Sequence, residues 1–183
     1  MLRCAFSFVI ALLCVRLLSA TGPPGIWLDV PFVKQEKNGC GAASVAMVMQ
    51  YWLGQAGNAA GESADAAHIQ SALYSRQAKG IYGSAIESYL RDQNFRTFTL
   101  HGTWSDLQQH LEKGRPLIVM LRPAHQLPLH YAVVSGIDPV QELVLLNDRA
   151  ERKLQRLDRA TFEKSWNAAG NWTLLAVPQQ AAH

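Results

Sequence analysis

The spacing of apolar positions changes near the middle of the chain. Up to about residue 114, most apolar residues recur roughly every three or four positions, which is typical of helices that bury one face. Beyond it, short apolar runs alternate with polar turns, which favours strands. The predicted helices cover residues 41–52, 64–76, 80–93, 103–114 and 158–166. The predicted strands cover residues 95–100, 116–121, 130–137, 142–148, 153–157 and 172–177.

Two of these segments have further local signals. The helix 41–52, "GAASVAMVMQYW", is apolar on nearly all sides, so we expect it to be buried in the middle of the domain. Residues 26–35 alternate like a strand, and Pro31 marks them as an edge segment.

The order of the segments, mainly helices first and strands afterwards, predicts an α+β fold. A helical half would pack against an antiparallel sheet made of successive neighbouring strands. A cleft between the two halves is then the natural place for a site.

The first twenty residues, "MLRCAFSFVIALLCVRLLSA", have the features of a secretory signal. Arg3 precedes an apolar run of about a dozen residues, and small residues end at Ala20. We therefore expect a signal peptide at 1–20, a linker at 21–27, one domain at 28–178 and a tail at 179–183. The expected location is periplasmic or secreted, with a membrane anchor through an uncleaved signal as the alternative.

Removal of this segment would leave one cysteine. Cys4 and Cys14 lie in the signal, so the mature chain would keep only Cys40, which cannot form an internal disulfide. A free thiol is a liability in an oxidising compartment, so its retention indicates either an inert buried residue or a working nucleophile.

Cys40 stands between Gly39 and Gly41 at the start of the predicted central helix. Backbone N–H groups are unpaired at a helix N-terminus and the helix dipole is positive there, and both favour thiolate over thiol. The two glycines suit a tight turn that a substrate backbone approaches closely, or they serve the turn alone.

A cysteine nucleophile needs a base and a group that orients the base. His130 opens a predicted strand after a proline-containing bend, and the next strand ends in Asn147 and Asp148, either of which could hold the imidazole. Gln35 could supply an oxyanion-hole donor together with the Cys40 N–H. We expect His68 and His110, on amphipathic helices, to be solvated.

The stretches "VPFVKQEKNGCGAASVAMVMQYW", "LHYAVVSGID" and "LVLLNDRA", in this order, resemble the papain-like cysteine peptidases that process double-glycine leader peptides. The resemblance extends from about residue 30 to about residue 177. It implies Cys40 as nucleophile, His130 as base, Asp148 as orienting acid and Gln35 as oxyanion-hole donor. It also implies a peptide or protein substrate, with an exporter or secretion system as a possible partner.

The chain departs from this family's pattern in two ways. Arg149 follows Asp148 where the family often has proline. No Gly-rich phosphate loop or set of transporter spans accompanies the domain, which argues against a double-glycine leader as the substrate.

The predicted activity is hydrolysis of peptide bonds. Two alternatives stay open: an acyltransferase or transpeptidase with the same acyl-enzyme, and a non-catalytic peptide-binding maturation factor. With a net charge of +3 and no basic run, nucleic-acid binding is not expected. We expect no cofactor, and one cysteine with scattered histidines offers no pair at metal-site spacing.

Overall fold

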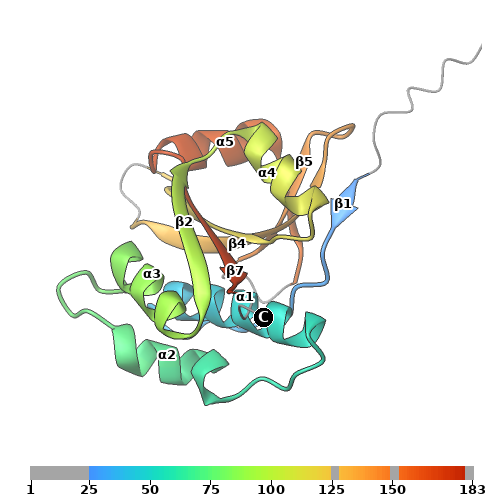
Figure 1. Cartoon of the computed structure of the whole chain (residues 1–183). Coiled ribbons are helices and arrows are strands. Elements are labelled where there is room, and N and C mark those ends of the chain that lie inside the picture. The colour runs from blue at the N-terminus through green and yellow to red at the C-terminus, as the bar shows by residue number, and fades with distance from the viewer. Residues whose placement is uncertain (1–24, 125–127, 149–152, 180–183) are drawn as a thin grey trace, which may run out of the picture.

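The computed structural model describes residues 25–124, 128–148 and 153–179. Within these residues a seven-stranded antiparallel sheet has helices on both faces (Figure 1). The strands are β1 (Ile26–Trp27), β2 (Phe95–His101), β3 (Leu117–Leu121), β4 (His130–Asp138), β5 (Leu143–Asn147), β6 (Gln155–Asp158) and β7 (Trp172–Pro178). The helices are α1 (Cys40–Gln55), α2 (Ala66–Leu73), α3 (Gly83–Asp92), α4 (Trp104–Glu112) and α5 (Arg159–Asn167), with a 3₁₀ turn at Glu62–Ala64. The predicted α+β class is confirmed.

The strand order in the sheet is β2-β7-β3-β4-β5-β6, with β1 paired to β4. The prediction of successive neighbours holds from β3 to β6, where each strand pairs with the next along the chain. It is wrong for β7, the last strand, which lies between β2 and β3. Alternating apolar residues show that a strand exists and which face is buried, but they do not name its partner.

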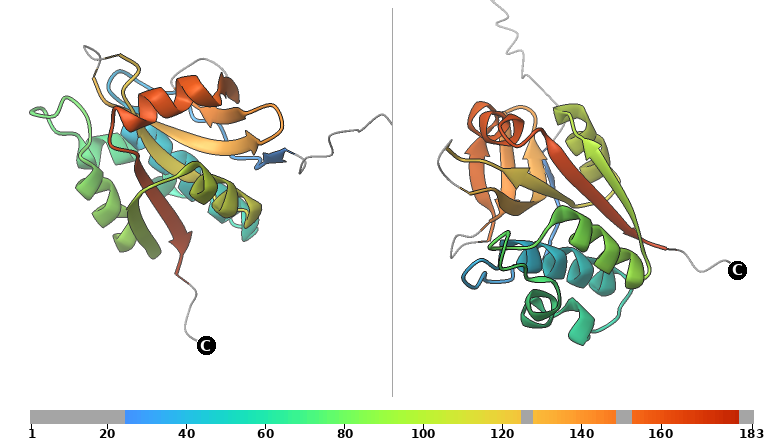
Figure 2. Two further views of the ribbon diagram at one scale, coloured as in Figure 1. Left: turned by 90° about the horizontal axis from the view of Figure 1, so that it is seen from above. Right: turned by 90° about the vertical axis from the view of Figure 1, so that its left-hand side faces the viewer.

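The sheet separates two hydrophobic cores. Helices α1, α2 and α3 lie on one side, and α4 and α5 lie on the other (Figures 1 and 2). Strand β3 supplies both cores by alternation: Ile118 belongs to the α1 core, while Leu117 and Val119 belong to the core under α4 and α5. The prediction of a single helical half is therefore incomplete. Helices α1, α2 and α3 form one layer, and α4 and α5 form a second layer on the opposite face of the sheet.

Helix α1 is the central element of its core. Residues Gly41 to Met49 are all buried, which explains why the segment is apolar on every side. Polar contacts near its C-terminal end fix it against strand β7 and the turn between α4 and β3. Trp52 Nε1 donates to the Ala176 carbonyl oxygen at 3.0 Å, and the Tyr51 hydroxyl donates to the Gly114 carbonyl oxygen at 2.9 Å.

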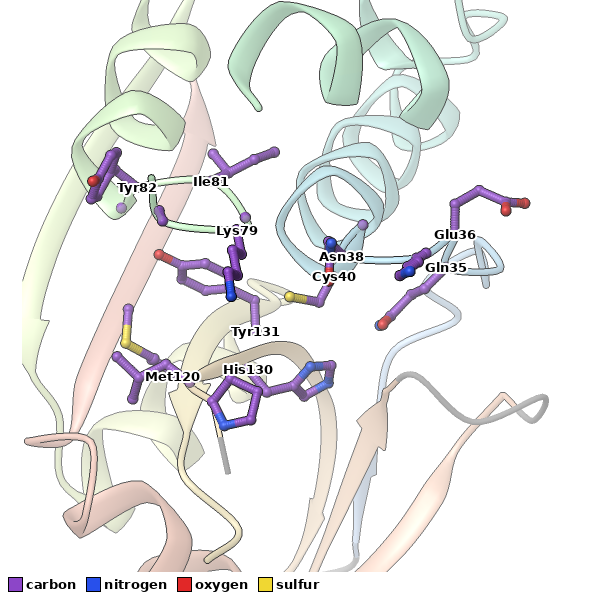
Figure 3. A pocket seen from close by; sticks show the side chains of 17 residues that line it. Gln35, Glu36, Asn38, Cys40, Lys79, Ile81, Tyr82, Met120, His130 and Tyr131 are labelled. Carbon is purple, nitrogen blue, oxygen red and sulfur yellow. The ribbon is translucent and has the colours of Figure 1, made fainter. Parts of the chain in front are cut away.

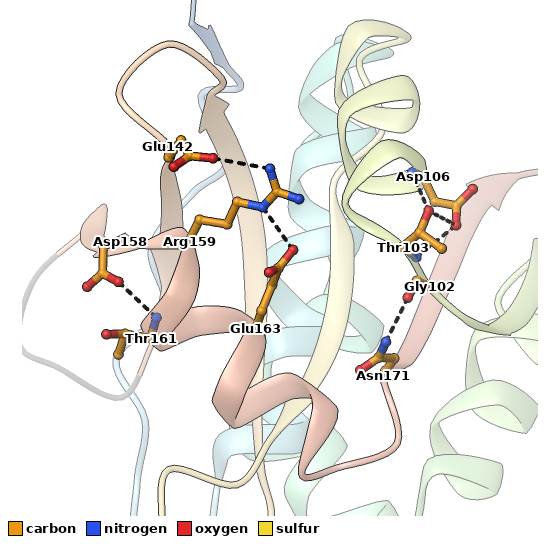
Figure 4. Close-up of polar contacts among 9 residues, drawn as sticks. All are labelled: Gly102, Thr103, Asp106, Glu142, Asp158, Arg159, Thr161, Glu163 and Asn171. Atoms are coloured by element: carbon orange, nitrogen blue, oxygen red, sulfur yellow. Dashed lines mark hydrogen bonds and ion pairs between the residues drawn. The ribbon is translucent and has the colours of Figure 1, made fainter.

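The helices of the other layer are capped by side chains (Figure 4). Thr103 and Asp106 form a reciprocal capping box at the start of α4, with Thr103 as the cap residue. Asp158 accepts from the Thr161 N–H at 2.8 Å and so caps α5. Arg159 donates to Glu163 at 2.9 Å within α5.

Several segments are shorter than predicted, and two of them differ most. Of residues 26–35, only Ile26 and Trp27 form a strand, and they pair with Ile137 and Gly136 of β4. The predicted helix 64–76 is limited to α2, because Asp65 caps its start and Tyr74 adopts an extended backbone.

The predicted signal 1–20 lies outside the described residues. Among the residues that are described, no helix is both long enough and apolar enough to span a membrane.

Candidate active site

Cys40 is the first residue of α1 and is half-buried at its N-terminus. The chain enters the helix through a tight turn in which the Gly39 N–H donates to the Glu36 carbonyl oxygen at 2.9 Å. A Cβ on Gly39 would lie 3.0 Å from that same oxygen, so a larger residue would crowd the turn. The glycine before the cysteine therefore serves the turn that places the sulfur.

Gly41 has a different role. A Cβ at this position would lie 3.2 Å from Ile81 Cβ and 3.4 Å from Tyr131 Cδ2. The space beside Gly41 is thus filled by the protein's own side chains. Gly41 was predicted, together with Gly39, to suit the close approach of a substrate backbone. In the structure Gly41 instead allows Ile81 and Tyr131 to pack closely against the start of α1.

His130 reaches Cys40 from the sheet. It is the first residue of β4 and is only 8% exposed. Its Nε2 atom is hydrogen-bonded to Oδ1 of Asp148, which follows β5 directly and is also 8% exposed. The antiparallel pairing of β4 with β5 brings these two residues together, because it sets Val133 opposite Asn147.

Cys40 and His130 line the same cleft, and each side chain shifts the pKa of the other. Since Asp148 occupies Nε2, the Nδ1 atom of the ring is the one left for the sulfur. The sulfur, the imidazole and the carboxylate, from three distant parts of the chain, therefore come together in one row (Figure 3 shows the first two).

The interactions within this row shift the pKa values of Cys40 and His130. Burial alone would raise the pKa of Cys40, but the hydrogen bond and charge of His130, with the backbone N–H groups of Tyr131 and Gly41, lower it overall. Burial alone would lower the pKa of His130, but Asp148 and Cys40 raise it to about 9. A lowered thiol pKa together with a raised imidazole pKa favours a thiolate beside an imidazolium.

Asn147 and Asp148, which the strand pattern left as alternatives, have different surroundings. Asn147 is fully buried and its side chain donates to the Val30 carbonyl oxygen at 3.1 Å and accepts from the Leu154 N–H at 3.1 Å. Both ends of its amide are thus used to tie neighbouring segments together. Only Asp148 of the pair contacts the imidazole.

Gln35 lies beside Cys40 at the edge of the same cleft (Figure 3). Its Nε2 atom is buried and has no hydrogen-bond partner among the described residues. A buried amide donor without a partner is costly, about 1–3 kcal/mol, so its presence at a cleft indicates a ligand that can accept the bond. The Cys40 N–H, in the first turn of α1, is a second donor close to it.

The cleft has a volume of about 730 Å³. Its two ends are formed by residues 35–40 and 78–83, and its floor includes Met120 and Tyr131. The segment 78–83 and the floor residues were not predicted as parts of the site. Tyr131 could have been inferred from its place next to His130, but Met120 and 78–83 carry no sequence signal that points to this cleft.

The other described histidines have separate environments. His68 is exposed and pairs with Glu62 at 3.2 Å, as expected of a surface residue. His110 differs from the prediction, because its Nδ1 atom is buried without a hydrogen-bond partner among the described residues, and burial lowers its pKa. Neither residue lines the cleft. His125 and His183 lie outside the described residues.

The arrangement can carry out nucleophilic attack on a carbonyl group. It presents a thiol with a lowered pKa, an imidazole with a raised pKa, and an unpartnered amide donor, Gln35 Nε2, in the same cleft.

Comparison with known proteins gives a consistent result. The family model of the Peptidase_C39 like family matches residues 27–174 of this chain. No protein among the curated sequences matches it.

Solved structures with a similar fold include the peptidase domain of ComA from Streptococcus, a bifunctional ABC transporter of a quorum-sensing pathway. That domain is 19% identical, with a TM-score of 0.63 over 81% of this chain and 98% of the other. A C39-like peptidase from Bacillus anthracis is also 19% identical, with a TM-score of 0.63 over 84% and 97% of the two chains. A double-glycine-motif protease of an AMS/PCAT transporter, solved with a leader peptide, is 18% identical, with a TM-score of 0.61 over 83% and 94%. These likenesses confirm the predicted papain-like peptidase fold.

Proposed function

This chain belongs to the Peptidase_C39-like family, and we propose that it is a cysteine peptidase that hydrolyses peptide bonds with Cys40 as nucleophile. The observation that carries the proposal is the row of Cys40, His130 and Asp148: Cys40 and His130 line one cleft and shift each other's pKa, and Asp148 is hydrogen-bonded to the His130 ring. A protein that only binds peptides has no need for such a row.

In the first step, the Cys40 thiolate attacks the carbonyl carbon of the peptide and an S–C bond forms. The negative charge moves to the carbonyl oxygen, where Gln35 Nε2 and the Cys40 N–H donate hydrogen bonds. The His130 imidazolium gives its proton to the amide nitrogen, the C–N bond breaks, and the amine leaves.

In the second step, a water molecule attacks the resulting thioester. Neutral His130 takes the proton from the water, the S–C bond breaks, and the acid product leaves. The thiolate and the imidazolium are then restored. Asp148 stays ionised throughout, and it holds the ring with Nδ1 toward the sulfur.

We also propose that the substrate is a peptide or protein outside the cytoplasm. This rests on the signal-like sequence at residues 1–20. The double-glycine protease with a similar fold is part of a transporter and was solved with a leader peptide. An exporter or secretion-system partner is therefore in keeping with the fold, while the substrate itself need not be a double-glycine leader.

The direct test is a digest of a peptide library by the mature protein under reducing conditions. We expect cleavage by the unmodified protein and none by Cys40→Ala. Mass spectrometry of the products, with and without an added amine, separates hydrolysis from acyl transfer. Absence of cleavage and of transfer for every peptide, with Cys40 intact and reduced, would refute the proposal.

A further inference from the structure

The directions of three groups around Cys40 indicate how a peptide would lie in the cleft. The carbonyl carbon under attack has three substituents: the oxygen, the leaving nitrogen and the acyl chain. Gln35 marks the side of the oxygen and His130 marks the side of the leaving nitrogen, while residues 78–83 lie on a further side (Figure 3). The residues that precede the scissile bond would therefore lie along the segment 78–83.

This segment is held in a defined shape at its start. Ser75 and Gly80 pair across a tight turn, with the Ser75 N–H donating to the Gly80 carbonyl oxygen at 2.8 Å. The Ser75 hydroxyl also accepts from the Ala78 N–H at 3.3 Å. The turn thus presents its last residues at the rim of the cleft in a fixed geometry.

Lys79 is the charged residue that this turn places at the cleft. Its φ of 49° lies in the left-handed region, which a non-glycine residue adopts infrequently. Its side chain reaches from the turn into the cleft (Figure 3). None of the ion pairs among the described residues involves the Lys79 ammonium group. The acidic side chains in those ion pairs contact other basic groups.

The surroundings of this ammonium group contain little competing negative charge. Glu36 lines the cleft at its opposite end, beside Gln35 and Lys37. Glu87 of α3 is paired with Arg91 at 3.6 Å. The uncharged side chains that line the cleft with Lys79 include Ile81, Met120 and Tyr131.

We propose that Lys79 is a specificity-determining residue that binds a carboxylate side chain in the acyl part of the substrate. The preferred peptides carry Asp or Glu within about three residues before the scissile bond. This inference rests on the proposed function, because the direction of the peptide follows from the assigned roles of Gln35 and His130. A contact with an exposed lysine such as Lys79 is worth about threefold to fivefold in kcat/KM, and salt weakens it.

The test compares pairs of C-terminally amidated peptides that differ only by Glu or Gln at each of the three positions before the bond. Amidation removes the terminal carboxylate, so only the side chain is tested. The variants are Lys79→Asn, which removes the charge while asparagine tolerates the left-handed backbone, and Lys79→Glu, which reverses the charge. Lys113→Gln, an exposed lysine at the end of α4, is the matched control.

We expect the unmodified protein and the control to prefer one Glu peptide by about threefold to fivefold, with the preference falling as salt rises. Lys79→Asn should abolish the preference and Lys79→Glu should invert it. An unchanged preference in Lys79→Asn, or no preference at any position, would overturn the inference while leaving the peptidase proposal standing.

Peptide binding to Cys40→Ala, measured by fluorescence anisotropy, gives a readout that does not need turnover. If no peptide is cleaved by the active protein, the peptidase proposal fails. The Glu-to-Gln ratio of dissociation constants, with and without Lys79→Asn, then still decides whether Lys79 recognises a carboxylate.

Discussion

At the scale of single residues, the site depends on how each group changes the protonation of its neighbour. Cys40 and His130 are both largely withdrawn from water, and burial disfavours the charged form of each. Each charge is retained because the other charge lies beside it and because the Asp148 carboxylate is hydrogen-bonded to the ring. The charged forms of Cys40 and His130 therefore depend on each other and on Asp148. Replacing any of these three residues should change the protonation of the remaining groups.

Replacing Asp148 by asparagine tests the support of the ring. The change keeps the size of the side chain but removes the charge that raises the pKa of His130, so the imidazolium form should be lost at a lower pH. We expect kcat to fall by roughly 10²-fold to 10⁴-fold. The upper limb of the pH–activity profile, which the His130 pKa places near pH 9, should move to lower pH. An unchanged profile would contradict the role given to Asp148.

Gln35→Ala tests the proposed oxyanion-hole donor. Because the Gln35 amide would act on charge that develops only in the transition state, kcat should fall by roughly 10²-fold to 10³-fold with little change in KM. The rate of Cys40 alkylation should stay the same, since Gln35 makes no contact that sets the thiol pKa. A loss that appears in KM alone would show that Gln35 binds substrate without stabilising the oxyanion.

At the scale of elements, the site is held by the connections between the strands and the segments around them. Asn147, at the end of β5, bonds both to Val30 and to Leu154. Asn147→Ala should leave these two backbone groups unsatisfied and lower the free energy of unfolding by about 2–4 kcal/mol, about 1–2 per group. Thermal or urea unfolding measures this loss. Equal stability of variant and parent would show that Asn147 is not a structural residue.

The pairing of β1 with β4 depends on Gly136. A Cβ at this position would lie 2.7 Å from the Ile26 carbonyl oxygen and 2.7 Å from Leu145 Cδ1. Gly136→Ala should therefore displace β1 and cost about 1–3 kcal/mol in urea unfolding. The matched control is Gly54→Ala in α1, where nothing lies within 4 Å, and which should stabilise the helix by up to about 1 kcal/mol. Equal effects of the two substitutions would refute this explanation of Gly136.

At the scale of the whole molecule, local sequence patterns predicted most elements but not all of their arrangement. Apolar spacing indicated every strand of the sheet and each α-helix, because burial on one face leaves a period in the sequence. The position of β7 between β2 and β3 could not be read in this way, since it depends on pairing across distant segments. The second helical layer was missed for the same reason.

The residues of the site were likewise predicted from the sequence only in part. Cys40 carried a local signal in its flanking glycines, and His130 stood at a strand end, so both could be proposed from the residues. The choice of Asp148 over Asn147 needed the resemblance to a family, because neighbouring residues at a strand end can turn to either side. Lys79 and Met120 join the cleft only through the folding of the chain.

The central claim is that Cys40 and His130 form a thiolate–imidazolium pair, and the rate of iodoacetamide alkylation of Cys40 as a function of pH tests it most directly. Because the pKa of Cys40 is lowered from its ordinary value of 9.0, the rate should already be high well below pH 8. It should fall as the pH drops through that lowered pKa. In His130→Ala the Cys40 thiol stays buried but loses its charged partner, so the pKa of Cys40 should rise. The alkylation rate at neutral pH should then fall by at least about tenfold. Alkylation at the rate of an ordinary thiol, with the same pH dependence in both proteins, would contradict the account.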